Sequence, residues 1–167
     1  MHQMTKDNLE AAFAGESQAY MRYTIYAEKA EKEGLANIAR LFRAIAYAEK
    51  VHATNHLRVL GGIGTTSENL KEGVGGEVYE VDEMYPAFQA VAELQDERAA
   101  AKTMYYAVEA EKIHADMYRT ARASVLEGED IELGEVWICE NCGYTVEGEP
   151  PDECPICNVK REWFVRF

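Results

Sequence analysis

Two Glu-x-x-His pairs are the clearest candidates for chemistry in this sequence: Glu49 with His52, and Glu111 with His114. On a helix this spacing places the carboxylate and the imidazole on one face, one turn apart. Two further glutamates, Glu16 and Glu77, each follow a glycine and precede one of these pairs by a similar distance. One glutamate from each of two helices and a Glu-x-x-His pair from each of two others form the ligand set of di-iron and di-manganese bundles.

Electrostatics favours a metal site over four unneutralised glutamates. Carboxylates gathered in a helical interior repel one another and lose hydration, so without cations they would take up protons. For a single Glu-x-x-His pair, the alternative of a solvated surface pair on a charged helix would be preferred, because glutamate is usually exposed. Two pairs in matching positions reverse that preference and predict a di-metal site.

Glu80 makes the predicted site asymmetric. It follows Glu77 by one helical turn, whereas the first half of the chain has Ala19 at the corresponding place. Glu80 could therefore add a fifth carboxylate. Pro86 follows soon after and is expected to remove a hydrogen bond to the carbonyl of Asp82 and bend the helix.

Two tyrosines are candidates for supporting the metal ligands. Tyr23 lies two turns beyond Glu16, and Tyr85 precedes Pro86. Their hydroxyls could donate hydrogen bonds to ligating carboxylates. The alternative is simple aromatic packing in the core, which ten tyrosines in the chain make a serious competitor.

An internal repeat supplies the helices that must position these side chains. Residues 5–16 match 66–77 at an offset of 61, and residues 48–53 match 110–115 at an offset of 62. Each half contains helix-favouring residues with apolar positions every three or four residues, so each is predicted to form a helical hairpin. The four helices are expected at about 5–33, 36–60, 67–94 and 97–127.

The turns of the two hairpins follow from the glutamate spacing. The midpoint between Glu16 and Glu49 falls beside Gly34, a natural helix terminator. The second midpoint falls near 95–96, where neither glycine nor proline marks a turn. Equal helix lengths on both sides of each turn would bring the paired glutamates to one level.

All four cysteines lie in the last 29 residues, in two Cys-x-x-Cys knuckles: Cys139 with Cys142, and Cys154 with Cys157. Each knuckle can direct two thiolates at one ion, which gives a tetrahedral sulfur site for iron or zinc. Two disulfides in a secreted protein are the lesser alternative. A module this small has too little core to fold unaided, so a metal is expected.

A shift in composition separates this module from the helices. Three of the four prolines and both tryptophans lie after Gly134. We therefore predict a mainly α protein, with a four-helix bundle at 1–134 followed by a small metal-binding β/loop domain at 135–167.

Composition excludes several partners. The formal charge of −13 and the lack of a basic patch argue against nucleic acid. No apolar run approaches the ~18 residues that span a bilayer, so no membrane association is expected. The N-terminus lacks the basic and apolar regions of a secretory signal, and we expect a cytoplasmic protein.

Taken in order, these motifs resemble those of the rubrerythrins over nearly the whole chain. The segments that support the resemblance are Ala14-Gly15-Glu16-Ser17-Gln18, Ala48-Glu49-Lys50-Val51-His52, Glu83-Met84-Tyr85-Pro86, Ala110-Glu111-Lys112-Ile113-His114, Cys139-x-x-Cys142-Gly143-Tyr144 and Cys154-Pro155-x-Cys157. The resemblance implies a ferritin-like bundle with a non-haem di-iron centre and a rubredoxin-like tail with one iron on four cysteines.

The resemblance also implies roles for individual residues. His52 would exchange with Glu80 as the irons change oxidation state, and the permanent ligands would be Glu16, Glu49, Glu77, Glu111 and His114. It implies reduction of hydrogen peroxide, with electrons from a reduced nicotinamide passing through a reductase or rubredoxin. One departure, Asn158 where rubredoxins often have glycine, slightly weakens iron over zinc in the tail.

Three other functions stay open at this stage. Ferritin-like iron storage uses similar ligands but needs a hollow shell and gains nothing obvious from a one-electron carrier. An oxygenase would need an apolar substrate pocket. A metal-buffering or regulatory protein would use the tail as a zinc ribbon.

The connector 61–66 bears on assembly. Six residues reach at most ~20 Å, whereas a 25-residue helix is ~38 Å long. If the third helix must start at the far end of the bundle, the second hairpin would pack against the first hairpin of another copy, giving a domain-swapped homodimer. The alternative is that residues 66–76 unwind and lengthen the crossing.

Overall fold

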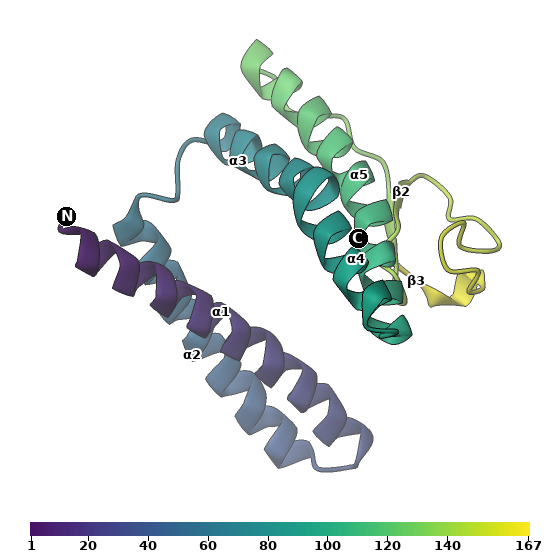
Figure 1. Ribbon diagram of the computed structural model, residues 1–167, viewed down its shortest axis with the longest axis horizontal. Helices are drawn as coiled ribbons and strands as arrows, with labels where there is room; N and C mark the ends of the chain where they lie inside the picture. Colours follow the sequence, from purple (N-terminus) through teal and green to yellow (C-terminus); the bar gives the residue numbers. More distant parts are fainter. The chain divides into compact units, whose positions relative to one another are not determined.

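The computed structural model describes residues 1–167, which form long helices followed by a small three-stranded sheet (Figure 1). This confirms the predicted mainly α fold with a small β domain after it. The chain divides into two compact units, Met1–Gly64 (unit 1) and Thr65–Phe167 (unit 2). The helices are α1 (Gln3–Lys32), α2 (Ala36–Leu60), α3 (Thr66–Tyr79), the π-helical turn η1 (Glu80–Met84), α4 (Tyr85–Leu94) and α5 (Arg98–Glu127).

Unit 1 is an antiparallel hairpin of α1 and α2. The chain reverses at Gly34, whose φ of 78° lies in the left-handed region that glycine adopts without strain. Alanines at seven-residue spacing on α2 form its buried stripe: Ala39, Ala46 and Ala53. Small side chains at this period let the two helices approach closely.

The turn between α4 and α5 also contains a residue in the left-handed conformation, but that residue is not a glycine. Asp96 takes the left-handed conformation, with a φ of 55°. Aspartate is among the few residues that tolerate this region, because its short polar side chain can bond locally. The predicted turn near 95–96 is therefore in place.

Helix α3 begins immediately after the connector. The Thr65 side chain accepts from the backbone N–H of Glu68, and the Glu68 carboxylate accepts from the backbone N–H of Thr65. This capping box fixes the start of the helix at Thr66. The idea that residues 66–76 unwind is wrong, since this segment is helical despite its three glycines.

The helix widens into a π turn before Pro86. In η1 the backbone N–H of Tyr85 donates to the carbonyl of Glu80, five residues back. Proline has no N–H and its ring crowds the carbonyl four residues earlier, so a wider turn relieves that contact. Where the sequence predicts only a bend at this proline, the structure has a π turn ahead of it.

The tail is the segment 135–167 of unit 2. Its sheet has the order β2-β1-β3, all antiparallel, with β1 (Val136–Cys139), β2 (Thr145–Glu147) and β3 (Phe164–Arg166), and η2 (Arg161–Trp163) precedes β3. Phe164 is buried and meets Tyr144 edge to face, with ring centroids 6.2 Å apart. None of the helices has both the length and the apolar composition needed to cross a bilayer.

Candidate metal centres

Unit 1 holds the first half-site: Glu16 on α1, with Glu49 and His52 on α2. The Nδ1 atom of His52 lies 3.0 Å from Oε2 of Glu49 and 3.8 Å from Oε1 of Glu16. One ligand atom from each of the three residues lies within 4.8 Å of the others. The antiparallel hairpin thus brings together the three side chains that the sequence singled out in its first half.

Unit 2 holds the second half-site: Glu77 on α3, with Glu111 and His114 on α5. Nδ1 of His114 lies 2.5 Å from Oε2 of Glu111, and the Glu77 and Glu111 carboxyl groups are hydrogen-bonded to each other. Here too three ligand atoms lie within 4.8 Å. The two half-sites match residue for residue.

The electrostatics of the second half-site favour a cation. Burial, then the hydrogen bond and charge of Glu111, raise the pKa of Glu77 to about 7. Burial and the nearby Glu111 also raise the pKa of Glu80, although His114 opposes this shift. A divalent ion placed among these oxygens would favour their ionised forms and replace the shared proton. Carboxylate and imidazole donors suit iron and manganese, so the residues fit the expected metals.

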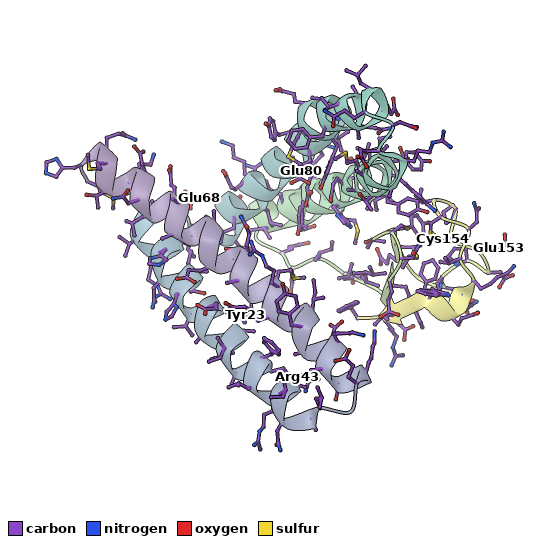
Figure 2. All side chains as sticks on the ribbon, turned by 60° about the horizontal axis from the view of Figure 1, so that its bottom comes forward. Tyr23, Arg43, Glu68, Glu80, Glu153 and Cys154 are labelled. Atoms are coloured by element: carbon purple, nitrogen blue, oxygen red, sulfur yellow. The ribbon has the colours of Figure 1, made fainter.

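The two candidate tyrosines differ in their surroundings. Tyr85 lies near the carboxylates, and its pKa is raised by burial and then by the charges of Glu80, Glu111 and Glu77. Tyr23 packs in an aromatic group with Phe42 and Tyr26, at centroid distances of 6.1 and 6.3 Å, between α1 and α2 (Figure 2). Its hydroxyl forms no hydrogen bond with a carboxylate within unit 1, so for Tyr23 the hydrogen-bonding role stays a prediction.

The four cysteines converge on one point inside the tail, where Figure 2 labels Cys154. Their sulfur atoms all lie within 4.8 Å of one another, and none forms a disulfide. The pairs Cys139–Cys157 and Cys142–Cys154 have Sγ–Sγ distances of 3.6 and 3.5 Å. A tetrahedral ion with bonds of ~2.3 Å requires sulfur separations of about 3.8 Å, so the arrangement fits one metal ion.

The backbone of the two knuckles is equivalent. Gly143 and Asn158 each follow a second cysteine, have φ values of 79° and 60°, and donate N–H to the carbonyl of the first cysteine at 2.9 Å. Asparagine tolerates this left-handed position, so the departure from glycine leaves the loop geometry unchanged.

Hydrogen bonds prepare the knuckles for thiolates. Burial opposes ionisation of Cys157, but hydrogen bonds from the Asn141 side chain and the Val159 N–H outweigh it and lower its pKa to about 7. Burial raises the pKa of Cys142, although the backbone N–H of Tyr144 favours its thiolate. Metal binding would complete the ionisation of all four sulfurs.

Sequence reasoning missed two polar residues beside these sites. Asn141 supports Cys157, and the Thr145 hydroxyl lies 2.8 Å from Nε2 of His114. The second contact joins residues 31 positions apart on different elements. No local pattern in the sequence could have indicated it.

Paired Glu-Glu-His sets on helices, followed by a four-sulfur tail, are typical of di-metal carboxylate proteins with an added metal-binding domain. The family model "Rubrerythrin" matches residues 7–122, and the model "Rubrerythrin, rubredoxin-like domain" matches residues 137–165. The chain belongs to the rubrerythrin family. Its metal cofactors are the di-iron carboxylate pair and the iron of the four-cysteine site.

Relatives match over nearly the full length. Rubrerythrin-2 of Clostridium acetobutylicum is 44% identical, covering 98% of this chain and 97% of that protein. Nigerythrin of Nitratidesulfovibrio vulgaris is 33% identical, covering 98% and 86%. A nigerythrin structure described as fully reduced and all ferrous matches with a TM-score of 0.57 at 32% identity, again covering 98% of this chain and 86% of that one.

Proposed function

We propose that this protein reduces hydrogen peroxide to water at its di-iron site, with electrons delivered through the tail. The observation that supports this best is the contact between the tail and the second half-site within unit 2. Strand β2 of the tail packs on α5, where Thr145 touches the second half-site at His114. A one-electron carrier placed beside a two-metal site suits repeated redox turnover.

The balance of the reaction sets what the protein must provide. One hydrogen peroxide takes up two electrons and two protons, its O–O bond breaks, and two water molecules form. A di-iron(II) pair supplies two electrons, one from each ion. Protons must arrive at the same place, and the Tyr85 hydroxyl near Glu80 is a candidate source beside the carboxylates.

We propose ligand roles by position. Glu49 and Glu111, each in a Glu-x-x-His pair, would bridge the metal ions, while Glu16 and Glu77 would cap the two ends. His52 and Glu80 would alternate as ligands with oxidation state. Support for this last role comes from their placement, because Glu80 begins the π turn and the His52 side chain is half exposed.

The donor to the tail is proposed to be rubredoxin or an NAD(P)H-dependent reductase. Four unpaired cysteines held at metal-binding distance need a reducing compartment, which supports a cytoplasmic location. The tail iron would then return electrons to the bundle one at a time.

The test is stoichiometric. Iron-loaded full-length protein, reduced without oxygen, is mixed with small amounts of hydrogen peroxide while ferrous iron and peroxide are measured. We expect one peroxide consumed per two bundle ferrous ions oxidised, with no oxygen released. Peroxide left unconsumed by the reduced protein would refute the proposal. Uptake of many iron ions per chain into a large mineral-filled assembly would instead favour storage.

We further propose a domain-swapped homodimer, in which each complete site joins unit 1 of one copy to unit 2 of the other. Unit 1 alone leaves large apolar side chains about half exposed, among them Met21, Ile25, Leu41 and Ile45. A two-helix hairpin buries too little surface to be stable by itself. The short connector and the immediate start of α3 at Thr66 support closure by a second copy.

Complementation between inactive variants tests this arrangement. One variant has Glu16→Ala and Glu49→Ala, and the other has Glu77→Ala and Glu111→Ala. In a swapped heterodimer one of the two sites regains all its ligands, so equal mixing should restore about a quarter of wild-type sites. Heterodimers that form, by native mass spectrometry, yet bind no bundle iron would show that each site comes from one chain.

A further inference from the structure

Thr145 is the one polar or charged residue that the fold buries, with 5% of its surface exposed. It begins β2, and its hydroxyl makes two contacts. Oγ1 lies 3.0 Å from the carbonyl oxygen of Gly143 and 2.8 Å from Nε2 of His114. A buried hydroxyl with two partners holds both of them in place.

The direction of these two hydrogen bonds follows from the number of protons. A carbonyl oxygen can only accept, so the single hydroxyl proton of Thr145 is donated to Gly143. The contact with His114 must then run the other way, with Nε2–H donating to Oγ1. This places a proton on Nε2 and leaves Nδ1, which faces Glu111, as the nitrogen available to a metal ion.

The repeat provides an internal comparison. His52 occupies the equivalent place in the first half-site, but its hydrogen bonding is through Nδ1 to Glu49 and no protein group in unit 1 holds its Nε2. Its side chain is 53% exposed, against 28% for His114. Only the histidine beside the tail is held at both nitrogens.

We propose that Thr145 is a positioning residue that fixes His114 in the Nε2-protonated tautomer and presents its Nδ1 to the metal. This inference rests on His114 being a metal ligand of the second half-site, and it does not depend on which reaction the site carries out. The hydrogen-bonded partner of a ligating imidazole sets both its tautomer and its orientation. Here that partner comes from the tail, two residues after Gly143 and three after Cys142.

Gly143 connects Thr145 to the four-cysteine site of the tail. Its carbonyl accepts from Thr145, its N–H donates to Cys139, and it directly follows Cys142. A continuous path of covalent and hydrogen bonds therefore joins a cysteine ligand to a histidine ligand. The same hydroxyl that orients His114 also ties the tail to α5.

Nitrogen NMR of the histidine rings in the full-length protein tests the proposal directly. In Zn²⁺-loaded wild type we expect a slowly exchanging proton on Nε2 of His114 and a metal-shifted Nδ1. Thr145→Val removes the hydroxyl while keeping the branched shape, and should abolish the slow exchange. A proton on Nδ1 with metal on Nε2 in the wild type would overturn the assignment.

Metal affinity gives a second readout. Zn²⁺ binding beyond the first equivalent should weaken by about 10–100-fold in Thr145→Val, as is typical for lost outer partners of metal ligands. Thr145→Ser keeps the hydroxyl and should restore both the affinity and the Nε2 proton. Thr103→Val, an exposed hydroxyl on α5 bonded to its own helix, is the matched control. Equal behaviour of Val and Ser variants at position 145 would refute the role.

Discussion

Replacing Glu111 with alanine should empty the bundle of iron while leaving the tail iron in place. Glu111 lies against both other members of the second half-site, hydrogen-bonded to Glu77 and 2.5 Å from His114. Losing an outer partner of a ligand already costs about 10–100-fold, so losing a proposed bridging ligand should lower peroxide turnover by more than about 100-fold. Bound iron should fall from three ions per chain to one.

Iron analysis and steady-state peroxide consumption measure this effect, with Glu109→Ala as control. Glu109 is on the same helix but forms its ion pair with Lys112, with an Nζ–Oε1 distance of 2.6 Å. Its loss should leave the iron content and turnover unchanged. Full iron loading in Glu111→Ala would mean that the second half-site is not a metal site.

Replacing Cys154 with serine should stop peroxide turnover driven by the electron donor, because the substitution destroys the four-cysteine site of the tail and not the bundle site. Cys154 is completely buried and its sulfur lies 3.5 Å from that of Cys142. A structural metal contributes on the order of 10–16 kcal/mol to folding, and the small tail has little other core. We expect loss of the visible bands of thiolate-bound ferric iron, unfolding of the tail, and turnover lowered by more than about 100-fold.

The bundle itself provides the control for this variant. Chemically reduced Cys154→Ser, given enough ferrous iron to offset the lost Thr145 contact to His114, should still consume one peroxide per iron pair in a single turnover, because the bundle ligands of both half-sites remain. Unimpaired turnover with the physiological donor would contradict the proposed electron route. A colourless tail that binds one zinc ion in wild-type protein would exclude an electron-carrying role.

The sequence was sufficient to predict most of the scaffold because its signals are local. Glu-x-x-His spacing, the repeat and Gly34 depend only on helix periodicity and backbone preference, and the structure places the resulting side chains together in each half-site. The cysteine knuckles are equally local. The second turn was harder, since Asp96 provides the left-handed residue that glycine usually provides.

Other features depend on contacts between distant segments. The hydrogen bond of Thr145 to His114 arises only when the tail packs on α5, so nothing near either residue indicates it. The π turn depends on how the helix accommodates Pro86, which propensity alone does not determine. The large apolar side chains that the hairpin of unit 1 leaves half exposed are also not evident from a linear pattern, because exposure depends on how the helices pack.

The π turn also explains an arithmetic mismatch between the halves. Glu16 and Glu77 are offset by 61 positions, but the left-handed turn residues Gly34 and Asp96, like the two Glu-x-x-His pairs, are offset by 62. The additional residue therefore lies between Glu77 and Asp96, the interval that contains η1. If the two halves arose by duplication of an ancestral hairpin, insertion of a single codon in the second copy would account for this shift. The same insertion would account for a π turn that only the second half contains.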